Sequence, residues 1–384
     1  MSKNEPAAGQ AWSERVRGLN RLRSGVSRSL VGRSIATLHD LVNRSDDPAP
    51  VSHDGASSIV EANFRFAADV IHTARENLSA DSTQITYAEE VISFFLKGIR
   101  GRMFQNYVNY GLRSLTRGSK LVEQYCPPGQ QPARYLDVGC AYGGAPVAMA
   151  KRGVRYAVGL EFDERLLKLS RSLAIQEDVD DQVKFISGDL TEYEDVSALG
   201  TFDLVTCIDV LEHVLDPESA IKNLAVLTGT SGTVIVDVPN PLSFEMIERD
   251  PHHHLFGSVL LDRDSAIRVF DNEFPKARYT VGYFHSLEWY TTRLEAAGFR
   301  VAVLDSPPCD SDAVARTRSG IESLRGNFAR ASSKWPDWRR ELVGSALDGF
   351  YDSAGNYKVL ATTNAAKFQL RHAVPVYHIR CSIE

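Results

Sequence analysis

The sequence predicts an α/β fold with a mostly parallel sheet, because short apolar segments alternate with helix-like segments along its central part. The apolar segments lie within residues 134–144, 156–162, 183–190, 202–214 and 232–239. Short runs of this kind are typical of strands that are buried on both faces of a sheet. The intervening helix-like segments supply the crossover connections that parallel strands need.

The first apolar segment ends in a glycine-rich turn. Apolar residues at positions 135, 136 and 138 predict a buried strand, and Gly139, Gly143 and Gly144 follow it. Glycine lets the backbone turn sharply and approach a ligand closely. A helix-like run over residues 145–151 comes next, so we expect the N–H groups at its start to face the same crevice. This order of strand, turn and helix also serves dinucleotides and phosphates.

Acidic residues stand where the second and third segments end. Glu161, followed by Phe162, is placed to accept hydrogen bonds from both hydroxyls of a ribose. Asp189 can accept a hydrogen bond from the exocyclic amine of adenine, and Leu190 can pack on the ring. The strand ends therefore predict a site for a ligand that contains a nucleoside.

Helix caps and a further strand continue the alternation. Residues 163–176 predict a helix with Asp163 at its N-cap. Residues 286–298 predict another helix, which begins after Ser286 and ends at Gly298, and residues 299–304 predict a sixth strand.

Taken in order, these segments resemble the class I S-adenosylmethionine-dependent methyltransferases, closest to the branch that includes the ubiquinone-type O-methyltransferases. Asp137, Gly139, Ala141 and Gly143 match the family's first motif, with Ala141 where many members have glycine. Leu-Glu-His-Val at residues 211–214 matches the segment after the fourth strand. The resemblance covers residues 134–299. It implies a Rossmann-like, seven-stranded, mostly parallel sheet with an antiparallel last strand near residues 357–363, an N-terminal helical region and helical insertions.

S-adenosyl-L-methionine is the cofactor that the resemblance implies. The residues implied to bind it are Asp137, Gly139, Ala141, Gly143, Glu161, Phe162, Asp189, Leu190 and Asp209. A nicotinamide-binding Rossmann domain is the alternative, because Gly139, Ala141 and Gly144 also fit the pattern Gly-x-Ala/Gly-x-x-Gly.

Residues 239–284 are expected to hold the acceptor chemistry, because ligands in open α/β sheets bind beyond the carboxyl ends of the strands. This segment contains Asp250 and then His252, His253 and His254, in a pattern similar to methyltransferases among glycan-modifying enzymes. One of these histidines, or His285, could be the general base that removes a hydroxyl proton. The alternative for each is a loop or packing role.

A metal site made of the three adjacent histidines and Asp250 is disfavoured, because adjacent histidines point in divergent directions. We therefore expect no metal.

The histidines favour methylation of a hydroxyl oxygen on a small molecule or a glycan. The alternatives are a protein or RNA methyltransferase and a non-catalytic cofactor-binding subunit. A net charge of −6 at pH 7 disfavours nucleic acid as a partner.

The composition divides the chain into an arm, a lid, a catalytic domain and a tail. The ranges are 1–58 for a basic arm and linker, 59–126 for a helical lid region, 134–365 for the methyltransferase domain with insertions at 239–284 and 306–353, and 366–384 for the tail. The basic and apolar residues of the arm predict an amphipathic helix, which could have only a solvent-exposed basic face, dock an anionic partner or surface, or belong to a transit peptide. Arg100, Arg102, Tyr107 and Tyr110 could line the acceptor site or only pack.

The sequence shows no apolar run long enough to span a membrane and no secretory segment. Its five scattered cysteines lack metal-ligand spacing and are expected to be reduced thiols. These features predict a cytoplasmic enzyme, and they are compatible with a homo-oligomer.

Overall fold

The computed structural model describes residues 83–96, 102–275, 277–353 and 357–383. The expected N-terminal arm (residues 1–58), the first part of the expected lid and Arg100 lie outside these ranges. Within them, no helix is long and apolar enough to cross a membrane.

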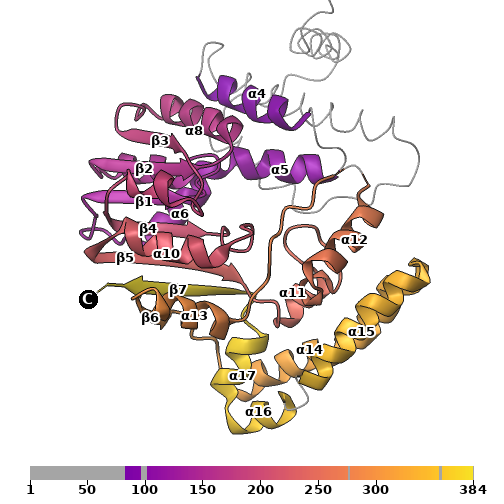
Figure 1. The fold of residues 1–384 in the computed structure, drawn as a ribbon. Helices are drawn as coiled ribbons and strands as arrows, with labels where there is room; N and C mark the ends of the chain where they lie inside the picture. The colour runs from indigo at the N-terminus through magenta and orange to yellow at the C-terminus, as the bar shows by residue number, and fades with distance from the viewer. Residues whose placement is uncertain (1–82, 97–101, 276, 354–356, 384) are drawn as a thin grey trace, which may run out of the picture. The chain divides into compact units, whose positions relative to one another are not determined.

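The core of the fold is a seven-stranded sheet in the order β3-β2-β1-β4-β5-β7-β6 (Figure 1). Its strands are β1 (Arg134–Val138), β2 (Tyr156–Glu161), β3 (Val183–Ser187), β4 (Phe202–Ile208), β5 (Thr228–Pro239), β6 (Arg300–Val303) and β7 (Val376–Ser382). β4 pairs in parallel with β1 and β5, whereas β7 runs antiparallel to both β5 and β6. The predicted α/β fold, mostly parallel with an antiparallel last strand, is confirmed.

The last strand does not lie where the sequence indicated. The expected strand at residues 357–363 is wrong, because these residues form the helix α16 (Tyr357–Thr363), in which Tyr357 and Ala361 are buried one turn apart. The strand is β7, inside the segment expected to be a tail. Tyr377, Ile379 and Cys381 are buried at alternate positions of β7, the period of a strand.

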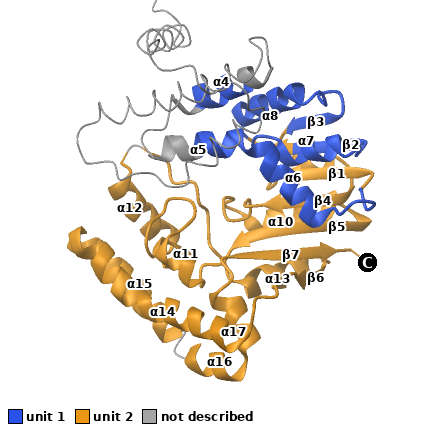
Figure 2. Cartoon of the chain, turned by 180° about the vertical axis from the view of Figure 1, so that it is seen from behind, with its two compact units in different colours: residues 1–131, 140–159, 163–186 blue, residues 132–139, 160–162, 187–384 orange. Residues whose placement is uncertain are grey.

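The chain forms two compact units, which Figure 2 colours separately. The first consists of residues 1–131, 140–159 and 163–186. Its described helices are α4 (Thr83–Leu96), α5 (Arg102–Leu112), α6 (Ser114–Tyr125), α7 (Gly144–Lys151) and α8 (Glu164–Gln176). As predicted, Asp163 caps α8, because its carboxylate accepts a hydrogen bond from the backbone N–H of Arg165.

Helices α6 and α7 of this unit approach each other closely at two glycines. A Cβ atom on Gly118 would lie 2.2 Å from the backbone carbon of Gly144, and one on Gly144 would lie 2.0 Å from the backbone oxygen of Ser114. The two backbones can pack at this distance only because neither glycine has a side chain.

The second unit consists of residues 132–139, 160–162 and 187–384. Its described helices are α9 (Tyr193–Ser197), α10 (Pro217–Leu227), α11 (Phe244–Glu248), α12 (Arg263–Glu273), α13 (Leu287–Ala296), α14 (Ser311–Ala331), α15 (Asp337–Ser353), α16 and α17 (Ala365–His372), with 3-10 turns η2 (Ser258–Leu260) and η3 (Ser332–Lys334). Ser286 caps α13 by accepting a hydrogen bond from the N–H of Trp289, as predicted.

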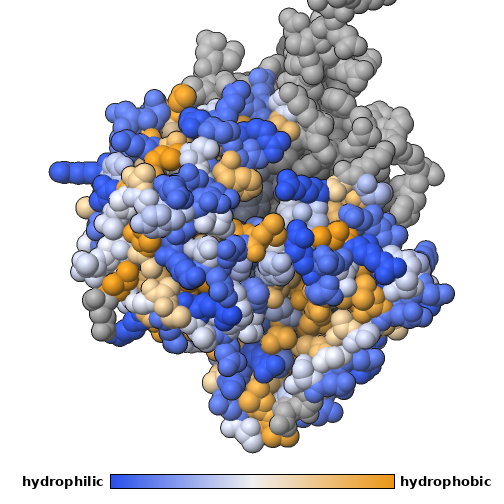
Figure 3. Space-filling view, viewed as in Figure 1, coloured by the Kyte–Doolittle hydropathy of each residue, from blue (hydrophilic) through white to orange (hydrophobic). Residues whose placement is uncertain are grey.

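The two insertions expected from the sequence share one hydrophobic core. Ile247 and Phe270 from the first insertion pack with Ile321 and Val343 from the second and with Phe368 of α17. Figure 3 shows apolar surface in the region of α11, α14 and α15, bordered by hydrophilic side chains. The segments that are separate in sequence therefore form a single helical layer within the second unit.

Candidate active site

Asp137, near the carboxyl end of β1, has a buried carboxylate that accepts a short hydrogen bond. It lies opposite Thr206 of β4, whose hydroxyl donates a hydrogen bond to it over 2.6 Å. Burial raises the pKa of Asp137 to about 7; the Thr206 hydrogen bond lowers it, and the Glu161 carboxylate raises it further. This carboxyl is therefore sensitive to any charged ligand placed near it.

The turn after β1 needs glycine at its first position. Gly139 has a φ of +67°, and its N–H donates to the carbonyl of Leu160 over 2.8 Å. A Cβ atom here would lie 2.5 Å from Cγ2 of Val210. The turn thus brings bare backbone to the end of the strand, as a close-fitting ligand requires.

The ends of β2 and β3 carry the next predicted residues. Glu161 is buried, and its carbonyl accepts a hydrogen bond from the N–H of Gly188 over 3.2 Å, which joins the two strand ends. Phe162 beside it is 75% exposed. Asp189 is exposed, with one carboxylate oxygen accepting from the N–H and hydroxyl of Thr191, and Leu190 is buried.

In the first unit, Ala141 and Gly143 form the rest of the turn. Both have positive φ values, +46° and +75°. The carbonyl of Ala141 accepts a hydrogen bond from the hydroxyl of Ser170 over 2.8 Å. A Cβ atom on Gly143 would lie 2.7 Å from the ring of Phe185. Ala141 therefore holds a left-handed conformation that glycine adopts with less strain, consistent with the glycine of the motif.

Asp209 begins the segment after β4. It also has a positive φ, +54°, and its N–H donates to the carbonyl of Asp237 on β5 over 3.2 Å. The turn that follows leads the chain to Glu212 and His213.

Glu212 is the centre of a buried cluster that includes one of the predicted histidines. Its side chain is fully buried, and among the described residues neither carboxylate oxygen accepts a hydrogen bond. Nε2 of His252 lies 3.5 Å from its Oε1, and Nε2 of His213 lies 4.0 Å from the same oxygen. His213 is oriented by Nδ1, which lies 2.8 Å from the carbonyl oxygen of Thr280 and donates to it, so Nε2 is left with a lone pair.

Two opposing effects act on the pKa of His252. Burial lowers its pKa, but the Glu212 carboxylate, with further contributions from Asp250 and Asp209, more than offsets burial, and the pKa is raised. His252 is therefore a stronger base than its burial alone would allow.

The other three histidines predicted as bases lie apart from this carboxylate. His253 is buried and packs on the rings of Phe270 and Tyr279 at centroid distances of 4.6 and 4.9 Å, and burial lowers its pKa to about 4. His254 is exposed, at a φ of +58°. His285 stacks on Trp289 at 3.7 Å, and burial and the charge of Arg293 lower its pKa. Packing and loop roles are favoured for these three.

Asp250 fixes the loop that carries the histidines. Its carboxylate accepts hydrogen bonds from the backbone N–H groups of His252, His253 and Leu255 and from the hydroxyl of Ser258. These contacts occupy the carboxylate, so the set of Asp250 and three histidines is not assembled as a metal site. Glu212 and His213 were not among the predicted site residues, although the Leu-Glu-His-Val motif contains both.

A different set of side chains could hold a cation. Within the part of the chain that the structure describes, Glu212, His213 and His252 each offer one ligand atom, and these atoms lie within 4.8 Å of one another. One carboxylate and two imidazoles suit a divalent transition metal.

Comparisons with known proteins identify the family of the chain. The methyltransferase domain family matches residues 105–303, more than half of the chain. Ubiquinone biosynthesis O-methyltransferase of Alkalilimnicola ehrlichii is 34% identical over 131 residues, 34% of this chain and 48% of that protein. Norajmaline N-methyltransferase of Rauvolfia serpentina is 28% identical over 126 residues, 32% of this chain and 42% of that protein. The chain spans about half the length of the curated relatives it matches.

Among solved structures, phosphoethanolamine N-methyltransferase 2 of Haemonchus contortus in complex with S-adenosyl-L-methionine is similar, with a TM-score of 0.36 and 14% identity over 70% of this chain and 52% of that one. The extent of the family match and the order of the strand-end residues lead to one assignment. The chain belongs to the methyltransferase domain family, within the class I S-adenosylmethionine-dependent methyltransferases.

Proposed function

We propose that this protein transfers the methyl group of S-adenosyl-L-methionine to a hydroxyl oxygen of a small molecule or a glycan. The observation that carries the proposal is the position of His252, whose Nε2 lies 3.5 Å from the buried carboxylate of Glu212. A hydroxyl loses its proton as its oxygen is methylated, and an imidazole next to a carboxylate is suited to accept that proton.

The cofactor would be held by residues at the strand ends. Gly139 and Gly143 give bare backbone where a Cβ would clash. Glu161 is suited to the ribose hydroxyls, and Asp189, Leu190 and the exposed Phe162 to the adenine. When bound, the cofactor supplies an activated methyl group.

The residues near Glu212 would then act on the acceptor. His252 would take the proton from the acceptor hydroxyl at Nδ1, which has no hydrogen-bond partner among the described residues, while Nε2 faces the Glu212 carboxylate, which would stabilise the imidazolium that forms. Asp209, at the end of β4, would lie near the transferred methyl group. No base beyond His252 is needed for the proton balance of the reaction.

A cation bound by Glu212, His213 and His252 is the second candidate for activating the acceptor. The observation that favours it is the buried carboxylate without a hydrogen bond, which a divalent cation would neutralise. In that case the cation, rather than a free imidazole, would lower the pKa of the hydroxyl. Turnover that is lost on treatment with EDTA and restored by zinc or magnesium would favour the cation over the base.

The cofactor residues can be tested by titration calorimetry with S-adenosyl-L-methionine. Glu161→Ala and Asp189→Ala should each weaken binding by about 1–3 kcal/mol, because each removes a hydrogen-bond acceptor from the nucleoside. Asp180→Ala, at an exposed position after α8, is the control and should bind as the unchanged protein does. Normal binding in both test variants would remove these residues from the site.

The base is tested by incorporation of labelled methyl groups into a panel of hydroxylated and aminated acceptors. His252→Asn should lower turnover by about 10²–10⁴-fold, the usual contribution of a general base, while cofactor affinity stays the same. His285→Asn is the control, since His285 stacks on Trp289 and, unlike His254, does not line the cavity in the helical layer of the second unit. Full turnover in His252→Asn would rule out the base, and labelling of amines alone would replace oxygen by nitrogen as the acceptor atom.

Several further properties belong to the same proposal. We expect a cytoplasmic enzyme that acts on a small molecule or glycan rather than a nucleic acid, with an N-terminal arm and a lid region ahead of a catalytic domain that extends through β7.

A further inference from the structure

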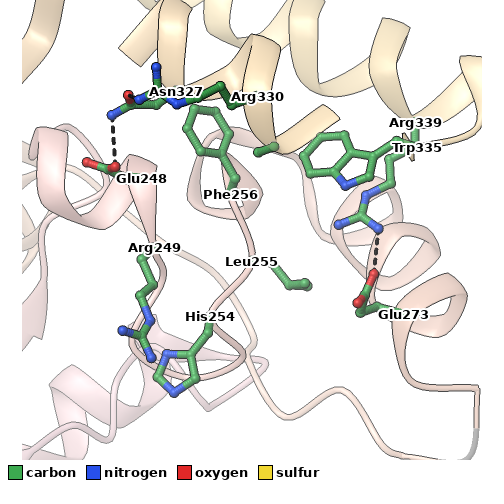
Figure 4. Close-up of a pocket in the computed structure, with 11 residues that line it drawn as sticks. Glu248, Arg249, His254, Leu255, Phe256, Glu273, Asn327, Arg330, Trp335 and Arg339 are labelled. Atoms are coloured by element: carbon green, nitrogen blue, oxygen red, sulfur yellow. Dashed lines mark hydrogen bonds and ion pairs between the residues drawn. The ribbon is translucent and has the colours of Figure 1, made fainter. Parts of the chain in front are cut away.

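A cavity lies in the helical layer of the second unit, beside the histidine loop. It has a volume of about 620 Å³ (Figure 4). Its lining comes from the end of α11, the loop after it, the end of α12, α14 and the start of α15. The side chains that matter most are those of Arg249, Leu255, Phe256, Arg330, Trp335 and Arg339.

The two acidic side chains at this cavity already have partners. Glu273 accepts a hydrogen bond from Arg339 over 2.7 Å, and Glu248 accepts one from the amide of Asn327 over 2.8 Å. Arg249 and Arg330 also line the cavity, and among the described residues no carboxylate lies within ion-pair distance of either. The described lining therefore carries three arginines against two carboxylates, an excess of one positive charge.

Arg339 is built into the wall in an unusual way. It is 3% exposed, and its Nε–H donates to no acceptor among the described residues. Its guanidinium lies 4.0 Å from the centre of the Trp335 ring, over the face of the indole. A buried guanidinium that keeps an unused donor is energetically costly unless an anion or water completes its hydrogen bonds.

The cavity wall also includes apolar side chains. Leu255 and Phe256 are buried, and the indole of Trp335 is half-buried at the same cavity. Rings and aliphatic groups pack well on such surfaces, whereas arginines recognise carboxylates and phosphates through paired N–H donors.

We propose that this cavity binds the anionic end of the methyl acceptor, a carboxylate or phosphate next to a planar or apolar group. This inference rests on the proposed function and narrows its substrate class. The loop of residues 250–257 connects the two sites, with His252 at the Glu212 cluster and His254 at the cavity. The Cα atoms of His252 and His254 lie at most about 7 Å apart, a separation that an acceptor with a planar group and an anionic end can bridge.

The test uses the full chain and naphthyl compounds as probes in titration calorimetry. Naphthyl phosphate and naphthoate should bind at least about ten-fold more tightly than the neutral naphthylmethanol. Arg249→Glu and Arg330→Glu should each weaken binding of the two anions by about ten-fold or more and leave binding of the alcohol unchanged. Arg316→Glu is a matched control on α14, because Arg316 is exposed and does not line the cavity.

The two anions also distinguish between the groups that the acceptor can carry. Tighter binding of naphthyl phosphate would indicate an acceptor with a phosphate, and tighter binding of naphthoate would indicate one with a carboxylate. Equal binding of the alcohol and both anions would overturn the proposal, as would anion binding that neither arginine variant weakens.

Titration of the same variants with S-adenosyl-L-methionine separates this inference from the proposed function. Normal cofactor binding shows that each variant is folded. If the unchanged protein binds the cofactor but not the anions, only the proposal that the cavity binds an anionic group is overturned. If the unchanged protein does not bind the cofactor, the methyltransferase proposal is overturned instead.

Discussion

Glu212 occupies surroundings that ordinarily disfavour an ionised carboxylate. It is fully buried, and the imidazoles of His252 and His213 lie 3.5 and 4.0 Å from its Oε1. The hydroxyl of Tyr290 nearby is also buried without a hydrogen bond among the described residues. Because an unpaired buried charge is strongly destabilising, the carboxylate and the two imidazoles are best understood as one unit.

The charge of Glu212 should set the pH at which the protein becomes active. Its carboxylate raises the pKa of His252, and a base must be neutral to accept a proton, so turnover should rise as the pH increases through that raised pKa. Glu212→Gln keeps the shape and removes the charge. The burial of His252 then dominates, its pKa falls, and the rising limb of the pH–rate profile should move to lower pH.

This profile is measured on EDTA-treated protein, so that no cation contributes. Asp216→Asn, an exposed acid on the same strand-to-helix connection, is the control and should leave the limb in place. An unshifted limb in Glu212→Gln would contradict electrostatic control of His252 by this carboxylate.

The sign of the effect on stability is fixed by the same shift. A histidine whose pKa is raised by folding stabilises the folded chain below the pKa of the unfolded state, and that contribution is lost as the pH rises through the folded pKa. The ion pair with Glu212 therefore contributes in mildly acidic solution and fades above the raised pKa of His252.

At the scale of elements, α6 and α7 depend on contact between backbones rather than side chains. Gly118 and Gly144 face each other where no Cβ fits. This interface fixes the first residue of α7, which directly follows the predicted cofactor turn. The packing of α6 on α7 therefore helps to hold the predicted cofactor turn in place.

Gly118→Ala should destabilise the protein by about 1–3 kcal/mol, because the new methyl group meets backbone that cannot move aside. Unfolding in urea measures the change. Gly349→Ala in α15 is the matched control: its Cβ would meet no atom within 4 Å, and alanine favours a helix by about 0.5–1 kcal/mol. Equal changes in unfolding free energy for the two substitutions would show that α6 and α7 lie farther apart than the structure places them.

At the scale of the whole molecule, the sheet is completed by β7. This strand pairs with β5 along Thr233–Pro239 and with β6 on its other side. Ile379 is fully buried and pairs with Val236 on one side and Val303 on the other. The segment expected to be a tail is thus part of the core.

Ile379→Ala should cost about 2–5 kcal/mol of unfolding free energy, the usual range for removing most of a buried aliphatic side chain. Arg380→Ala, the exposed neighbour on the same strand, should change it by less than about 0.5 kcal/mol. Chemical denaturation of both variants tests the role of β7. A small effect of Ile379→Ala would mean that the carboxyl-terminal strand is dispensable.

Features determined by neighbouring residues could be predicted from the sequence. The glycine turn after β1, the cap at Asp163 and the sixth strand near residues 299–304 all follow from local patterns. What the sequence did not reveal depends on distant partners. The burial of Glu212 requires the loop that carries His252, the shared core requires Ile247 to meet Ile321, and β7 becomes a strand only between β5 and β6.

The position of β7 between β5 and β6 also has a consequence for how the protein is made. A ribosome completes β5 and β6 well before it reaches β7, so until then both strands present edges with unpaired N–H and C=O groups. Nascent chains in that interval are exposed to pairing with one another, the characteristic hazard of slow, non-local sheets. The proteostasis machinery, rather than the finished enzyme, therefore has to protect this half-built sheet during translation.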